Sequence, residues 1–187
     1  IGPAAGWTDF RDRFYPQPES DGQRIRGSAD RCNSDASGAG AFLAALDTAR
    51  RLPATEKAAL AAARADLSDW CRDPGSREMS DTSPEVNSAP GRAFLAYLDG
   101  AKAFYSGDFD GAGAAFARIG QTDVAWLREA ALYMRARALL NAAQVGIYGT
   151  YGYFDPNKPI AKGVADRNEA ALDAYLSAYP RGRYAAS

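Results

Sequence analysis

The amino-acid sequence predicts an all-α fold with no significant β-sheet. Apolar residues recur at helical spacing in several segments, Pro and Gly separate these segments, and no stretch alternates between apolar and polar residues as a strand would. The chain has 187 residues, of which 47% are apolar, so it is long enough to bury one compact core or two small ones. We expect more than half of the residues to be helical.

Residues 1–31 are predicted to form an irregular arm that contains one short helix. Trp7, Phe10 and Phe14 fall on one face of that helix, and Pro16 ends it. Two interpretations stay open. The rings pack as a lid on the helices that follow, or the arm docks on another protein.

Residues 32–71 are predicted to form a helical hairpin. Residues 33–35 are good N-caps for a first helix that runs to Leu52, and Pro53 breaks it. The second helix has an apolar stripe that faces the first. The stripe consists of Leu60, Ala63, Leu67 and Trp70. Because only a tight turn joins the two helices, they must be antiparallel.

Cys32 and Cys71 stand at the open ends of this hairpin, one before the first helix and one at the end of the second. Helices of nearly equal length bring these ends together, which is the geometry that a disulfide requires. Such a bond would stabilise the fold by about 4 kcal/mol and would place the protein in an oxidising compartment. The alternative is two buried free thiols in a cytosolic protein.

Residues 72–90 form a predicted polar linker rich in Pro, Ser and Asp, which either wraps the surface or is partly mobile. Residues 91–187 contain four further predicted helices. The first ends at Gly107, the second runs from Asp108 to Ile119, and a long third one is capped by Thr122 or Asp123 and extends toward Tyr148. After a loop over residues 149–163, the last helix is stopped by a proline.

Residues 100–119 resemble a tetratricopeptide repeat. The resemblance consists of a small residue in the first helix, a Gly-Asp-aromatic turn, and a small and an aromatic residue in the second helix. These positions are Gly100, Gly107, Asp108, Phe109, Ala112 and Phe116. The later Tyr175-Leu176, Tyr179-Pro180 and Tyr184-Ala185-Ala186 are similar to the second helix and exit of such a unit in bacterial envelope proteins. The resemblance implies stacked antiparallel hairpins, an α-solenoid, in the N-terminal fragment of a longer envelope protein.

Composition excludes several function classes. The chain contains no histidine, which rules out Ser-His-Asp and Cys-His catalysis and imidazole metal sites. Its net charge of −1 removes the electrostatic argument for a nucleic-acid partner. Two cysteines are too few for a zinc site, no phosphate-binding loop occurs, and no apolar run is long enough to span a membrane. The carboxylates of Asp108 and Asp110 are interpreted as helix capping. We therefore expect no metal, no cofactor and no catalysis.

Two candidate binding features lie in the second half of the chain. A polar stripe on the long helix consists of Tyr133, Arg137, Asn141 and Gln144, whose groups suit a ligand carboxylate or amide. A Gly-Tyr loop after it presents Tyr148, Tyr151 and Tyr153. For the stripe, the alternatives are a solvated helix face or an arginine buried with an internal partner. For the loop, the alternative is a set of rings that plug the end of the helical stack.

These features favour a non-catalytic protein-binding or scaffold module of an exported bacterial protein, located in the periplasm or cell envelope after removal of its signal peptide. The expected partner is a protein, a peptide or a glycan. Two alternatives stay open. One is a glycan-binding module that uses the tyrosine loop, and the other is the helical, non-catalytic arm of a larger envelope enzyme that resembles lytic transglycosylases.

Overall fold

The computed structural model describes residues 31–73, 78–80, 82–119, 122–145 and 162–185. These residues form helices and connecting segments, with no strand among them, so the all-α prediction is confirmed. The helices are α3 (Asp35–Thr48), α4 (Ala54–Arg72), α5 (Ala89–Ser106), α6 (Phe109–Ala117), α7 (Ala125–Gln144) and α8 (Lys162–Ala178). The predicted arm lies outside the described residues except for Arg31, and so does residue range 146–161.

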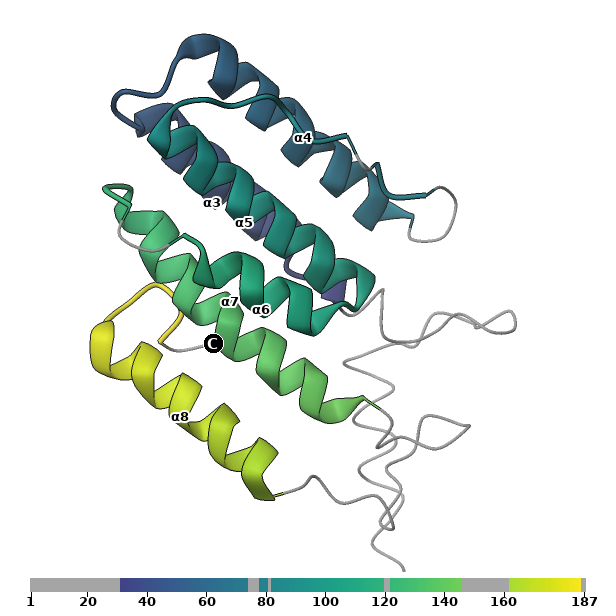
Figure 1. Ribbon diagram of the computed structural model, residues 1–187, viewed down its shortest axis with the longest axis vertical. Helices are drawn as coiled ribbons and strands as arrows, with labels where there is room; N and C mark the ends of the chain where they lie inside the picture. The colour runs from purple at the N-terminus through teal and green to yellow at the C-terminus, as the bar shows by residue number, and fades with distance from the viewer. Residues whose placement is uncertain (1–30, 74–77, 81, 120–121, 146–161, 186–187) are drawn as a thin grey trace, which may run out of the picture.

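Successive helices pack as antiparallel hairpins that follow one another from α4 to α8 (Figure 1). The three pairs are α3 with α4, α5 with α6 and α7 with α8. Each pair packs on the next, since α5 also contacts α4 and α7, and α6 also contacts α7. The helical-hairpin arrangement expected from the sequence is therefore present.

Aromatic side chains join the hairpins in the core. The Phe42 ring of α3 lies 5.2 Å from the ring of Phe94 and 5.9 Å from that of Tyr97, both on α5. The Tyr97 ring lies 4.9 Å from Trp126 at the start of α7. Phe42, Phe94 and Tyr97 are buried, and one continuous core extends from the first hairpin to α7.

Close packing of α5 on α6 depends on Gly100. A Cβ atom at this position would lie 2.7 Å from the Phe116 ring, too close for any side chain. The expected close approach of the two helices, with a small residue at position 100 beside the Phe116 ring, is thus confirmed. The turn between these helices also follows the sequence, because Gly107 ends α5 with a φ of 92° and the Asp108 carboxylate accepts a hydrogen bond of 2.9 Å from the Gly111 N–H.

The first hairpin is closed by a disulfide between Cys32 and Cys71, with the two Cα atoms 5.4 Å apart. This confirms the predicted pairing. The turn at the other end differs from the expectation, because α3 ends at Thr48 and does not reach Leu52. Arg51 there adopts a φ of 59°, which turns the chain so that Leu52 is buried in the core.

Two expected helix caps are wrong. Neither Thr122 nor Asp123 caps α7 with its side chain, since the helix begins after Val124 and the Asp123 carboxylate pairs with Arg51. Ser34 precedes α3, but its hydroxyl makes no capping bond and accepts a hydrogen bond from Arg137. In both places a tertiary partner competes with the local cap.

The described part of the predicted linker lies along α5. The Lys102 ammonium donates hydrogen bonds of 3.1 Å to the Ser80 carbonyl and 3.4 Å to the Thr82 carbonyl. Met79 packs against the core. The helix that follows begins at Ala89, inside the predicted linker, because Ser88 caps it and Pro90 occupies its first turn.

We predict that replacing both cysteines (Cys32→Ser with Cys71→Ser) lowers the free energy of unfolding by about 4 kcal/mol, since the bond closes a long loop in the unfolded chain. Urea unfolding followed by circular dichroism measures the change. Reduced wild-type protein should unfold at the same urea concentration as the variant, and reductant should not affect the variant. Equal stability of oxidised wild type and variant would contradict the prediction.

Candidate binding surfaces

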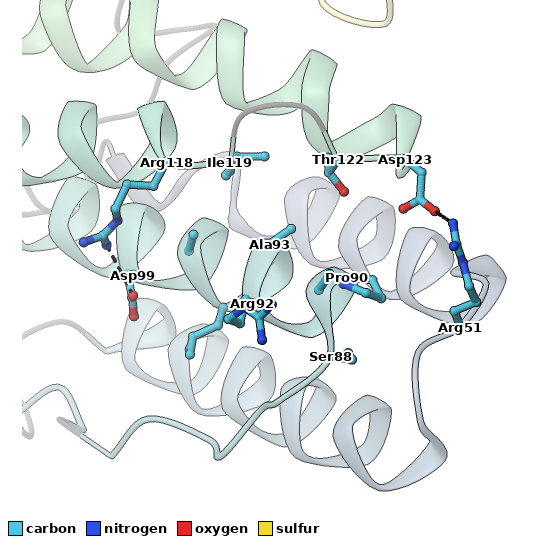
Figure 2. Close-up of a pocket in the computed structure, with 13 residues that line it drawn as sticks. Arg51, Ser88, Pro90, Arg92, Ala93, Asp99, Arg118, Ile119, Thr122 and Asp123 are labelled. Carbon is cyan, nitrogen blue, oxygen red and sulfur yellow. Dashed lines mark hydrogen bonds and ion pairs between the residues drawn. The ribbon is translucent and has the colours of Figure 1, made fainter.

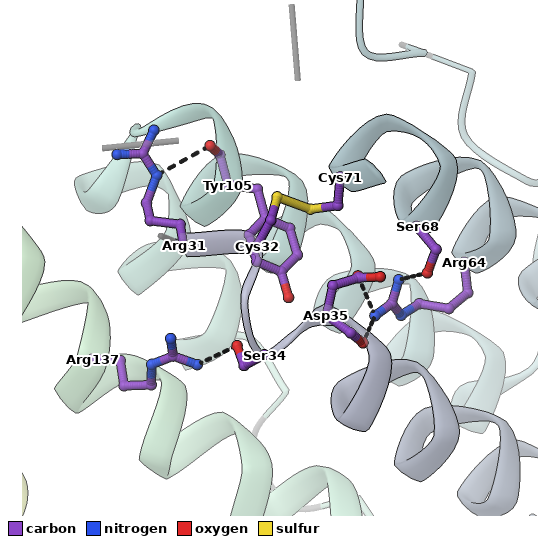
Figure 3. The surroundings of a disulfide bond; sticks show 9 residues. All are labelled: Arg31, Cys32, Ser34, Asp35, Arg64, Ser68, Cys71, Tyr105 and Arg137. Atoms are coloured by element: carbon purple, nitrogen blue, oxygen red, sulfur yellow. Dashed lines mark hydrogen bonds and ion pairs between the residues drawn. A yellow bond between two sulfur atoms is a disulfide. The ribbon is translucent and has the colours of Figure 1, made fainter. Parts of the chain in front are cut away.

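Residues 31–35, which lead into α3, contact α4, α5, α6 and α7. Figure 3 shows the contacts with α4, α5 and α7. The Arg31 Nε donates a 3.2 Å hydrogen bond to the Tyr105 carbonyl at the end of α5, and its guanidinium lies 5.6 Å from the Phe109 ring centroid. Cys32 is bonded to α4, and the Ser34 hydroxyl accepts from Arg137 on α7. These contacts hold the segment before α3 against α4, α5, α6 and α7.

Asp35 and Arg64 form a buried ion pair within this region. Their side chains are 11% and 3% exposed, and the carboxylate oxygen lies 2.7 Å from Arg64 Nη2. The Asp35 carbonyl and the Ser68 hydroxyl accept two further bonds from the guanidinium. Because both charges are desolvated and paired with each other, this cluster holds α3 against α4 and offers no group to a ligand.

The structure places the predicted residue Arg137 in a half-buried position between helices. Its guanidinium donates a 3.0 Å hydrogen bond to the Ser34 hydroxyl and lies 5.0 Å from the Phe104 ring centroid and 5.8 Å from that of Tyr133. No carboxylate of the described residues pairs with it. Arg137 thus has an internal partner, which corresponds to the alternative of an arginine that pairs within the fold.

Two of the other stripe residues, Asn141 and Tyr133, also make contacts within the fold. The Asn141 amide donates a 2.9 Å hydrogen bond to the Arg137 carbonyl of its own helix, and Gln144 is half-buried at the end of α7. Tyr133 stacks on Tyr184, with ring centroids 4.3 Å apart. Tyr148, Tyr151 and Tyr153 of the predicted loop lie outside the described residues.

Tyr133 belongs to a tyrosine cluster that joins α7 to α8 and to the segment after α8. The Tyr175 hydroxyl donates to the Glu129 carboxylate at 3.1 Å and accepts from the Tyr184 N–H at 2.9 Å. Burial raises the pKa of Tyr175 and of Tyr184, so both hydroxyls stay protonated at neutral pH. This cluster includes the Tyr-Pro exit noted in the sequence, and it packs the chain end onto α7.

A groove with a volume of about 960 Å³ runs along the exposed face of α5 (Figure 2). We call it the α5 groove. Its walls come from three places: α5 and its cap, the α3–α4 turn and the segment between α6 and α7. Its apolar lining consists mainly of small side chains, and none of the described residues that line it is aromatic. The apolar residues are Ala89, Pro90, Ala93, Leu95, Ala96 and Ile119.

Charged side chains are spread along the α5 groove. At one end the Arg118 guanidinium lies 3.6 Å from the Asp99 carboxylate, and at the other Arg51 lies 2.6 Å from Asp123. Arg92 lies between these pairs and donates to the Asn87 carbonyl (Figure 2). Arginine is the preferred partner of carboxylates because its planar fork binds both oxygens.

Glu56, on the first turn of α4, fixes the position of α5 and hence of the groove. Its buried carboxylate accepts hydrogen bonds from the Asn87 N–H at 2.9 Å, the Ser88 N–H at 3.0 Å and the Ser88 hydroxyl at 2.5 Å. A Cβ atom on Gly91 would lie 2.1 Å from this carboxylate, so only glycine allows the approach. The hydrogen bonds from Ser88 and Asn87 lower the pKa of Glu56 below its ordinary value.

Sequence reasoning missed the α5 groove. Arg51, Arg92 and Arg118 come from three distant segments, each of which looks like an ordinary charged surface position. The one local signal is Arg51 itself, which stands where the turn requires a left-handed conformation that glycine or asparagine would adopt more easily.

The titratable side chains of the described residues form no metal site. No cluster of three or more potential metal-ligating side chains occurs among these residues. Burial raises the pKa of Tyr97 and of Tyr105, so neither hydroxyl ionises at neutral pH. Asp108 caps α6, as expected, and its neighbour Asp110 is exposed in the first turn of that helix.

Comparison of the chain with protein-family models, with curated proteins and with solved structures found no match. Among the described helices, none combines the length and the apolar character that crossing a membrane requires.

We predict that Glu56→Gln destabilises the protein at pH 7 and that this difference disappears in acid. Because the pKa of Glu56 is lowered in the folded state, its carboxylate stabilises the fold above its ordinary pKa of 4.5 and loses that effect as the pH falls through the folded value. Melting temperatures between pH 7 and about pH 3 measure the effect. Glu85→Gln, at an exposed linker position, is the control, and a difference that is constant with pH would contradict the prediction.

We predict that Arg137→Ala lowers the free energy of unfolding by about 2 kcal/mol, because it removes a hydrogen bond to Ser34 and a cation–π contact with Phe104. The matched control is Arg135→Ala, since Arg135 is exposed on the same helix and should change the value by less than about 0.5 kcal/mol. Equal urea midpoints for the two variants would show that these contacts add nothing.

Proposed function

We propose that this chain is a non-catalytic protein-binding or scaffold module of an exported bacterial protein. The observation on which the proposal rests is the α5 groove, an open cleft of about 960 Å³ whose walls come from α5, from the α3–α4 turn and from residues between α6 and α7. A groove assembled in this way keeps its shape only while the hairpins stay stacked. The stack then acts as a rigid support for a bound segment.

The groups in the groove favour binding over catalysis. Its cations are arginines, whose planar forks of N–H donors suit carboxylate binding and not acid–base catalysis. The two carboxylates among its described lining residues, Asp99 and Asp123, lie next to these arginines, an environment that suits ion pairing. Recognition of charged and apolar groups along an extended segment fits this lining better than an acid–base reaction.

The disulfide supports the proposed compartment. Stable disulfides persist in the periplasm, at the cell surface and outside the cell, whereas cytosolic thiols are kept reduced. The close packing of Gly100 on Phe116 and the tyrosine cluster around Tyr184 support the resemblance to tetratricopeptide repeats of the bacterial envelope. On this basis we propose that the hairpins form a short α-solenoid.

The lining favours a peptide segment over a glycan in the α5 groove. Aromatic rings offer sugars a flat apolar face, and none of the described lining residues is aromatic. The stripe of Tyr133, Arg137, Asn141 and Gln144 remains a second proposed contact surface. It is supported by the Arg137 guanidinium, which pairs with a hydroxyl and with no carboxylate of the described residues.

Selection of peptides from a displayed random library against the oxidised protein tests the proposal. We expect enriched peptides that lose binding to Ala96→Trp, in which a large side chain fills the groove, but that still bind Ala62→Trp, at an exposed site on α4. Loss of binding to Asn141→Ala with Gln144→Ala would instead place the site on the stripe. If no peptide is enriched, or if all enriched peptides ignore both surfaces, the proposed function is wrong.

A further inference from the structure

We propose that the partner segment bound in the α5 groove is extended and acidic, and that Arg51, Arg92 and Arg118 bind its carboxylates. This inference rests on the proposed function and adds the chemistry of the partner.

The three arginines are spaced along the groove and do not cluster at one point. Arg118 lies at one end, Arg92 near the middle and Arg51 at the other end (Figure 2). Arg92 is exposed, and no carboxylate of the described residues lies within ion-pair distance of it. A row of guanidinium groups along an elongated cleft fits a chain that carries several carboxylates, since each fork can bind one of them.

The ion pairs at the two ends can exchange partners. The side chains of Arg51 and Asp123 are 81% and 52% exposed, and those of Arg118 and Asp99 are 64% and 38% exposed. Pairs as exposed as these contribute little to stability. A ligand carboxylate can therefore replace either aspartate, which then returns to water.

The apolar lining explains why the segment would be extended. Ala89, Ala93 and Ala96 leave room for a polypeptide backbone, and the half-buried Leu95 offers a contact to small apolar side chains. In an extended chain, successive side chains point to opposite sides. A segment that alternates acidic and apolar residues would place one kind on the arginines and the other on this lining.

Nucleic acid is the other polyanion that a row of arginines could bind. Single strands are held by aromatic side chains that stack on the bases, and the described lining residues include none. The groove therefore favours an acidic peptide.

Fluorescence anisotropy with a labelled ten-residue peptide of alternating Glu and Val tests the inference, with the matching Gln–Val peptide as the uncharged probe. We expect the Glu–Val peptide to bind more tightly and to lose affinity as sodium chloride is added. The double variant Arg92→Gln, Arg118→Gln should weaken binding by about tenfold or more. Arg167→Gln, at an exposed position on α8, should leave it unchanged.

A second double variant, Asp99→Asn with Asp123→Asn, separates the inference from a simple loss of folding. It removes the two carboxylates that compete for Arg118 and Arg51, so the Glu–Val peptide should bind several-fold more tightly than to wild type. A structural role of the two ion pairs would instead predict weaker binding. An increase in affinity cannot come from unfolding.

Three results would overturn the inference. The first is that the Glu–Val peptide does not bind at about 1 mM. The second is that this peptide binds the Asp99→Asn, Asp123→Asn variant more weakly than wild type. The third is that a ten-nucleotide thymidine strand binds at the groove as tightly as the Glu–Val peptide. If peptides from the library selection depend on Ala96 but are neutral or basic, the proposed function stands and only the acidic partner is wrong. If no selected peptide depends on Ala96, the groove is neither the binding site of the proposed function nor the site of an acidic partner.

Discussion

The disulfide between Cys32 and Cys71 is the constraint on which the arrangement of the other helices depends. It holds the beginning of α3 at the end of α4, and the residues next to Cys32 then contact three further helices. Each of these contacts involves a single hydrogen bond or ring contact, which is weak by itself. Because the crosslink already fixes the segment, little additional entropy is lost when they form.

The opposite end of α4 has the same role for the α5 groove. Glu56 accepts hydrogen bonds from Asn87 and Ser88, and Ser88 in turn caps α5 through the Gly91 N–H. One helix therefore carries both anchors: the disulfide at its end and the carboxylate at its beginning. The position of α5, and with it the position of Arg92 in the groove, follows from α4.

Local signals in the sequence were sufficient to predict the helices and the disulfide. Proline at position 53 marks the beginning of α4 and glycine at position 107 marks the end of α5 through the backbone angles that they allow. A hairpin of two similar helices brings its cysteines together without further information. The tight packing at Gly100 could also be expected, because the repeat pattern pairs a small residue with Phe116.

Features that depend on distant partners could not be predicted. Ser34 and Asp123 are good capping residues, but Arg137 and Arg51 bind their side chains in the folded protein, and nothing near them in the sequence indicates this. The same reason hides the α5 groove, whose arginines lie on three segments that meet only after the hairpins have stacked. The stripe that includes Arg137 was recognisable as a pattern, whereas its contact with Phe104 depends on how α5 and α7 pack.

The sequence separations of these contacts also determine the order in which the chain can complete its structure. Cys32 and Cys71 are separated by 39 positions, so the first hairpin can close without any residue that follows Arg72. Ser34 and Arg137 are 103 positions apart, and that contact must wait for α7. The α5 groove likewise acquires Arg118 and Asp123 after Arg51 and Arg92 are in place. The first hairpin therefore needs only its own residues to be complete, whereas the α5 groove needs residues from as far apart as Arg51 and Asp123.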